Sequence, residues 1–124
     1  MGLLDTMLGH AGEKNVADLQ GDIGPLLAQG EAMQRAFGFV RDLMVFTDRR
    51  LLLVNKQGIT GSKVEYLSIP YRAIVMYSLE TAGHFDLDAE LKIWISGQPA
   101  PLSHALGRKS GATDIVSILA QHVR

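Results

Sequence analysis

Between residues 31 and 107 the chain is a succession of short runs with the composition of β-strands. Turn residues such as Gly58, Gly61, Pro70 and Gly97 separate the runs. Most runs alternate apolar with polar side chains, which is typical of strands that bury one face. We therefore expect about seven strands. Their expected positions are residues 31–39, 42–47, 50–55, 63–69, 73–80, 84–96 and 100–107.

Helical periodicity is found toward the two ends of the chain. Apolar residues recur at helical spacing over residues 2–10, and Asn15 can cap a second short helix that ends before Pro25. Near the C-terminus, Thr113 can cap a longer helix that runs through residue 123. The inner stripe of that helix is expected to comprise Ile115, Ile118, Leu119 and Val123.

These elements fit one mainly β domain with helices at its ends. A chain of 124 residues is long enough for one core and too short for two ordinary domains. We expect an N-terminal helical segment, residues 1–30, and a β domain, residues 31–124. A run of strands followed by one amphipathic helix describes a two-sheet sandwich or a partly open barrel that the last helix caps.

Composition and charge exclude several classes of protein. The chain has no cysteine, so it can form neither disulfides nor thiolate metal sites. With 12 basic and 13 acidic residues, its net charge is −1, which offers nucleic acid no broad positive field. No run approaches the roughly 20 apolar residues that span a bilayer, and the N-terminus lacks the basic region of a secretory signal. We therefore expect a cytoplasmic protein.

Two long blocks of the sequence resemble a known family. The blocks FTDRRLLLVNKQGITGSKVEYLSIPY (46–71) and ETAGHFDLDAELKIWISG (80–97) are similar to the bacterial pleckstrin-homology-like (PH-like) domain family. The resemblance extends over most of the chain after residue 15. It implies a PH-like fold of two roughly orthogonal sheets with a capping C-terminal helix. It also implies a tendency to form ring-like homo-oligomers, and it brings no catalytic residues.

The acidic run within residues 84–96 is the first candidate for a metal site. Asp86, Asp88 and Glu90 fall on alternate positions, so neighbouring carboxylates would stand about 7 Å apart along a strand. The run lacks the turning glycine of a calcium loop, and none of the four histidines has a histidine partner at i+4. We therefore expect a solvated strand face, no metal, no cofactor and no enzymatic activity.

A second candidate site is basic. Many eukaryotic PH domains bind phosphoinositides through Lys and Arg around the first hairpin, and Arg41, Arg49 and Arg50 lie in that part of this chain. Asp42 and Asp48 lie among them and offset their charge. Because an exposed cation contributes only about 1 kcal/mol at an anionic membrane, so few cations would bind weakly. Anionic lipid at a membrane surface is therefore the alternative partner.

The strands carry more apolar surface than one small sandwich can bury. In the strand at 73–80, alternation places Ile74 and Met76 on one face and Tyr77 on the other, and both faces are apolar. Trp94 falls on the outward side of the next strand. Each apolar second face needs a cover, which either the chain's own helices or a second copy can supply. The expected oligomer interface comprises Ile74, Met76, Tyr77 and Trp94.

These features favour a non-catalytic binding or scaffolding module. Its copies would associate into a closed homo-oligomer, ring-like if it follows the family, and would present a repeated surface to other proteins. The alternative is a peripheral membrane module that binds anionic lipid through Arg41, Arg49 and Arg50.

Overall fold

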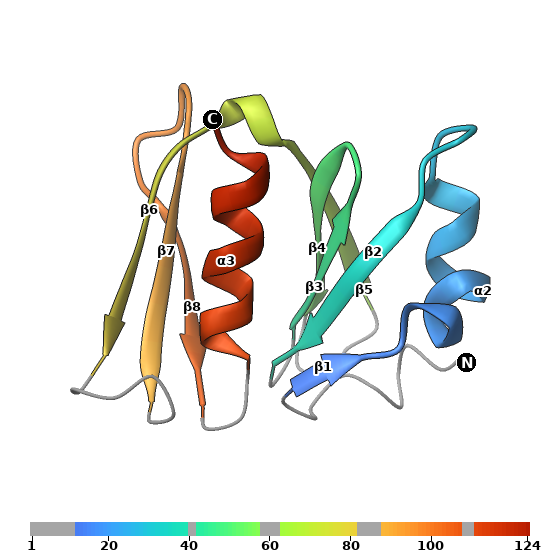
Figure 1. Ribbon diagram of the computed structural model, residues 1–124, viewed down its shortest axis with the longest axis horizontal. Helices are drawn as coiled ribbons and strands as arrows, with labels where there is room; N and C mark the ends of the chain where they lie inside the picture. Colours follow the sequence, from blue (N-terminus) through green and yellow to red (C-terminus); the bar gives the residue numbers. More distant parts are fainter. Residues whose placement is uncertain (1–11, 40–41, 58–62, 82–87, 108–110) are drawn as a thin grey trace.

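The computed structural model describes residues 12–39, 42–57, 63–81, 88–107 and 111–124, and within these ranges the strands form two antiparallel sheets (Figure 1). The five-stranded sheet has the order β1-β2-β3-β4-β5 and the three-stranded sheet the order β6-β7-β8. The first sheet contains β1 (Gly12–Lys14), β2 (Met33–Gly38), β3 (Asp42–Thr47), β4 (Arg50–Gln57) and β5 (Lys63–Pro70). The second contains β6 (Ile74–Thr81), β7 (Ala89–Ile95) and β8 (Leu102–Leu106). The expected two-sheet fold is confirmed, and the sheets do not close into a barrel.

Short helical turns precede β2, and one longer helix follows the last strand. The turns are η1 (Val16–Leu19), α2 (Gln20–Ile23) and η2 (Gly24–Leu26); a further turn, η3 (Tyr71–Ala73), joins the two sheets. The C-terminal helix is α3 (Ala112–His122). In Figure 1, α3 lies between the two sheets, and the N-terminal turns lie beyond the five-stranded sheet.

Two hydrophobic clusters follow from this layering. The larger one joins the inner faces of both sheets to α3, and its buried members include Phe37, Phe46, Leu91, Ile93 and Leu119. The smaller one lies on the outer face of the five-stranded sheet, where Leu19 and Ile23 pack against residues of β2, β3 and β4. The outer face of this sheet is therefore covered by the chain itself.

The N-terminal region differs from the expectation in one element. Asn15 does cap the first helical turn, since its side-chain oxygen accepts a hydrogen bond from the Ala17 N–H at 3.0 Å. β1, which precedes this turn and pairs with β2, is a strand that the sequence did not predict. Residues 2–10 lie outside the described residues. The division of the chain at residue 30 stays a prediction.

The start of α3 is also corrected. The residue before the helix is Gly111, with a φ of 87°, and it makes no side-chain cap. Thr113, the predicted cap, lies inside the first turn, because glycine alone enters this left-handed conformation without strain. A Cβ at Gly111 would also stand 2.9 Å from the Phe37 ring. Three residues of the predicted inner stripe are confirmed, since Ile115, Ile118 and Leu119 are buried. The helix ends at His122, so Val123 lies just beyond it and is half-buried against the larger cluster.

A register shift in β6 changes which residues share a face. The pairing of β6 with β7 is irregular between Ile74 and Met76, as in a β-bulge. Ile74 therefore faces the core and is 4% exposed, whereas Met76 faces outward and is 52% exposed. The shared face predicted for Ile74 and Met76 is wrong, because the bulge breaks the alternation from which it was inferred.

Candidate interaction surface

An apolar patch lies on the outer face of the three-stranded sheet. Met76 of β6 stands directly opposite Trp94 of β7, and Val75 protrudes beside them at the bulge with 62% of its surface exposed. Directly opposed cross-strand neighbours have Cβ atoms about 4.5–5.5 Å apart, so the Met76 and Trp94 side chains form one apolar surface. We call Val75, Met76 and Trp94 the outer patch.

No described helix covers the outer patch. Neither hydrophobic cluster includes its residues, and in Figure 1 the described helices lie on the other side of this sheet. The patch reaches the free edge of the sheet, because β6 is its outermost strand in the described part of the chain. An exposed apolar patch beside a free strand edge is typical of an interaction site.

The rest of this face is polar. Farther along the same strands, Ser78 stands opposite Lys92 and Glu80 opposite Glu90. The Glu90 carboxylate accepts a hydrogen bond from the Ser103 hydroxyl at 2.7 Å. The even positions of β7 are thus a polar strand face with Trp94 at its end, as alternation predicted. Asp86 lies outside the described residues, and Asp88 is exposed.

Two of the four predicted interface residues are turned toward the core. Ile74 belongs to the larger hydrophobic cluster and Tyr77 packs against it. Met76 and Trp94 remain on the outer face. We therefore retain Met76 and Trp94 for an interface and add Val75, which strict alternation would place on the opposite face from Met76.

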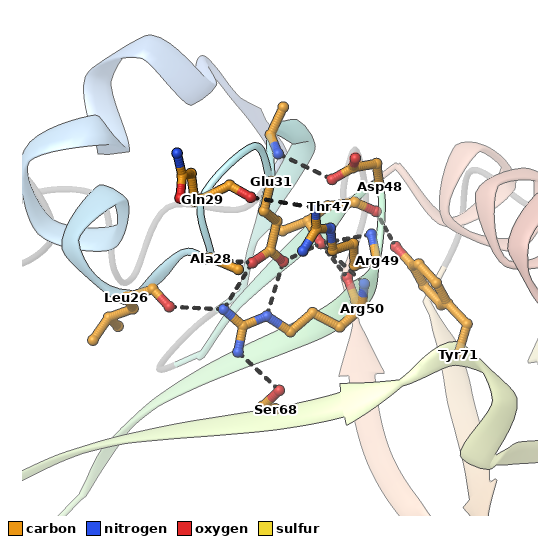
Figure 2. Close-up of polar contacts among 11 residues, drawn as sticks. Leu26, Ala28, Gln29, Glu31, Thr47, Asp48, Arg49, Arg50, Ser68 and Tyr71 are labelled. Atoms are coloured by element: carbon orange, nitrogen blue, oxygen red, sulfur yellow. Dashed lines mark hydrogen bonds and ion pairs between the residues drawn. The ribbon is translucent and has the colours of Figure 1, made fainter.

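A polar cluster lies at the other sheet, around the buried carboxylate of Glu31 (Figure 2). Arg50 Nε donates to Glu31 Oε2 at 2.9 Å, and Arg50 Nη2 donates to Oε1 at 3.1 Å. The Thr47 hydroxyl donates to Oε2 at 2.7 Å, and the Ala28 N–H donates to Oε1 at 2.8 Å. These contacts, chiefly the hydrogen bond from Arg50, lower the pKa of Glu31 from 4.5 to about 2.

Arg50 makes two further hydrogen bonds within the chain. Nη2 donates to the Leu26 carbonyl at 2.8 Å, and Nη1 donates to the Ser68 hydroxyl at 3.0 Å. The Glu31–Arg50 cluster thus ties the end of the N-terminal turns to β4 and β5. It fastens the helical cover to the five-stranded sheet and leaves this guanidinium little freedom to bind a ligand.

The basic candidate site is therefore not assembled in the described structure. Arg50 is committed to Glu31. Arg49 is exposed and donates to the Gln29 carbonyl at 3.3 Å, while Arg41 lies outside the described residues. The sequence analysis missed the ion pair between Glu31 and Arg50. The two residues are 19 positions apart, so no local pattern links them.

Two described histidines, His104 and His122, contact other side chains of the chain. His104 of β8 is buried, and its Nδ1 lies 3.2 Å from an Asp42 carboxylate oxygen of β3, a contact between the two sheets. Its Nε2 has no hydrogen-bond partner among the described residues. The His122 ring stacks on Tyr71 at 4.2 Å. In the described ranges, no group of three His, Asp or Glu side chains is placed to hold a metal ion.

Comparison with known proteins identifies the family. The family model of the bacterial PH domain matches residues 2–123. The chain belongs to the bacterial PH domain family. The resemblance noted in the sequence is thereby confirmed, and the two sheets with a C-terminal helix are the PH-like fold.

Individual relatives support the same assignment along nearly the whole chain. The uncharacterized protein YjqA of Bacillus subtilis is 50% identical over 121 residues, which are 97% of each chain. A crystal structure of a DUF1696 family protein with a pleckstrin-homology domain from Shewanella loihica has a TM-score of 0.81 at 44% identity, covering 94% of this chain and 99% of that one. A pleckstrin homology domain from Shewanella amazonensis has a TM-score of 0.81 at 48% identity, covering 99% of both chains.

No described helix of this bacterial PH domain is both long and apolar enough to cross a membrane.

Proposed function

We propose that this bacterial PH domain is a non-catalytic scaffolding module whose copies associate through the outer patch. The observation that carries the proposal is the Met76–Trp94 pair, an apolar cross-strand pair on a sheet face that no described element covers. The resulting homo-oligomer would present its other surfaces in multiple copies to partner proteins. Repetition of this kind raises avidity without any new contact.

The energetics favour burial of this patch. Apolar surface removed from water contributes about 25 cal/mol per Å². Aromatic residues and methionine are enriched at the centres of protein interfaces, where neighbouring residues exclude water. A stable interface buries about 800 Å² per partner, so the patch would be the centre of a larger contact. The polar residues of β7 beyond Trp94 would then form part of its rim.

The mass of the protein in solution tests the proposal. We expect the wild-type chain at micromolar concentration to sediment at a multiple of its 13.5 kDa monomer mass. Met76→Glu should reduce that mass, because it places a charge at the centre of the interface. Leu26→Glu is the matched control, since Leu26 is an exposed apolar residue, 43% accessible, on a different surface. A wild-type mass of one chain would overturn the proposal.

Anionic lipid is retained as the alternative partner, to be tested in the same preparation. With Arg50 held by Glu31, Arg49 is left as the exposed cation of the described candidates. Flotation with vesicles that contain phosphatidylserine, at low and high salt, distinguishes lipid binding from self-association. Salt-sensitive flotation of the Met76→Glu protein that Arg49→Ala abolishes would support the lipid alternative.

A further inference from the structure

A small pocket lies where β5 approaches the turn between β7 and β8. Its volume is about 300 Å³. One wall is formed by residues 67–70 of β5, and the opposite wall by Ile95, Ala100 and Leu102 with the Gln98 side chain beside them. This volume is at the lower end for ligand sites. The pocket suits one or two aliphatic side chains better than a large cofactor.

The four consecutive residues of β5 show that the pocket lies along the edge of the strand. Successive side chains of a strand point to opposite faces of its sheet. Leu67 and Ile69 point toward the core, and Ser68 and Pro70 point the other way. All four can line one pocket only where it opens onto the strand edge. An occupant of the pocket would therefore lie beside the backbone of β5.

That edge is available for pairing in the described structure. β5 is the outermost strand of the five-stranded sheet, with β4 as its partner on the other side. Among the described residues, no further backbone–backbone hydrogen bond involves Leu67, Ser68 or Ile69. An edge of this kind accepts an extended chain as an additional strand, in which alternate side chains fill pockets.

The charge of the site indicates what kind of segment fits. None of the lining residues carries an ionisable side chain. Arg50 contacts this wall by donating to the Ser68 hydroxyl, and the Glu31 carboxylate already neutralises its charge. A charged side chain would lose its hydration here without gaining an ionic partner. A neutral apolar side chain is complementary to this lining.

We propose that the edge of β5 and its pocket form a peptide-binding site for another protein. The ligand is an extended, uncharged segment that pairs with β5 as an added strand and inserts a branched aliphatic side chain between Ile69, Ile95 and Leu102. The site is separate from the outer patch and does not depend on self-association.

The test uses N-acetyl-leucine N-methylamide, the smallest probe that carries both a backbone amide pair and a leucine side chain. Titration of ¹⁵N-labelled Met76→Glu protein should give saturable amide shifts at Leu67, Ser68, Ile69 and Gln98, with the same affinity at low and high salt. Ala100→Trp fills the pocket and should weaken binding at least about tenfold, the discrimination expected of a small apolar pocket. Ala105→Trp is the matched control, because Ala105 is also exposed but lies on the outer side of β8.

Three results would overturn the proposal. The first is the absence of saturable shifts at β5. The second is an equal effect of the Ala100 and Ala105 substitutions, in proteins whose circular dichroism shows that both are folded. The third is a loss of the wild-type oligomer on Ala100→Trp, which would identify a second copy as the occupant. The mass of the Met76→Glu variant tests the outer patch separately, so the two proposals can fail independently.

Discussion

The two sheets of this bacterial PH domain differ in what lies on their outer faces. On the five-stranded sheet, Leu19 and Ile23 of the N-terminal turns are fully buried against the strands. On the three-stranded sheet, Met76 and Val75 remain more than half exposed, and no described element lies over them. A sandwich shares one core between two sheets, so each apolar outer face needs its own cover. This chain supplies such a cover for one sheet, and we propose that a second copy supplies the other.

The outer face of the five-stranded sheet, which we call the covered face, is also stabilised by a buried ion pair. The Glu31–Arg50 cluster joins the end of the N-terminal turns to β4 through a carboxylate whose side chain is 1% exposed. Beside the outer patch, by contrast, Lys92 approaches Glu90 at 3.8 Å with both side chains exposed. Exposed pairs contribute little to stability. The comparison therefore predicts large effects for substitutions at the covered face and small ones at the outer patch.

The largest effect is expected from Arg50→Met. This substitution removes the cation and leaves the Glu31 carboxylate buried, which costs about 3–5 kcal/mol when one partner of a buried pair is lost. Chemical denaturation in urea at pH 7 measures the free energy of unfolding. Arg49→Met is the matched control and should change it by less than about 0.5 kcal/mol, as is usual for an exposed site. Equal effects of the two substitutions would show that the cluster does not hold the cover.

Ile23→Ala should cost about 3 kcal/mol, because it opens a cavity under a fully buried side chain. The measurement is again urea unfolding, and retention of the native m-value would show that the rest of the domain still unfolds as one unit. A loss below about 1 kcal/mol, the typical effect of any substitution, would mean that the N-terminal turns contribute little to the sheet they cover.

Acid should weaken the covered face through Glu31. The pKa of Glu31 lies at about 2 in the folded protein, against an ordinary value of 4.5. The deprotonated carboxylate therefore stabilises the fold fully above pH 4.5, and this contribution is lost as the pH falls toward 2. The shift corresponds to roughly 3 kcal/mol. The difference in unfolding free energy between wild type and Glu31→Gln should shrink over this range; a constant difference would contradict the assignment.

The smallest effect is expected at the outer patch. Val75→Ala, made in the Met76→Glu background so that the chain is monomeric, should change the unfolding free energy by less than about 0.5 kcal/mol. Val75 is 62% exposed, so its truncation removes little buried surface. A cost comparable to that of Ile23→Ala would show that the outer patch is covered within a single chain.

Alternation and end signals predicted most of the fold. The runs at 42–47 and 50–55 became β3 and the first part of β4, joined by a tight turn in which the Thr47 hydroxyl accepts from the Arg50 N–H at 2.9 Å. Trp94 was correctly placed outward, because β7 keeps a strict period of two along the pairing. Strands of this length carry their own pattern, so their identity and faces can be read from one sequence.

Features that depend on distant partners or local irregularities could not be predicted. β1 is three residues long, too short for a periodic pattern, and it exists because β2 offers an edge. The bulge that turned Ile74 inward has no sequence signature, since it inserts one residue without changing composition. Glu31 and Arg50 meet because β2 pairs with β3 and β3 pairs with β4, which brings the start of β2 close to the start of β4. Both proposed sites use such features: the outer patch contains the bulge, and the β5 pocket joins two sheets.

The accessibility of Trp94 tests the central claim most directly. The chain has one tryptophan, so acrylamide quenching of its fluorescence reports on the outer patch alone. We expect quenching of the wild-type protein at micromolar concentration to be weaker than that of Met76→Glu, and to strengthen on dilution as copies separate. Equal quenching of the two proteins at every concentration would contradict the claim that a second copy covers this face.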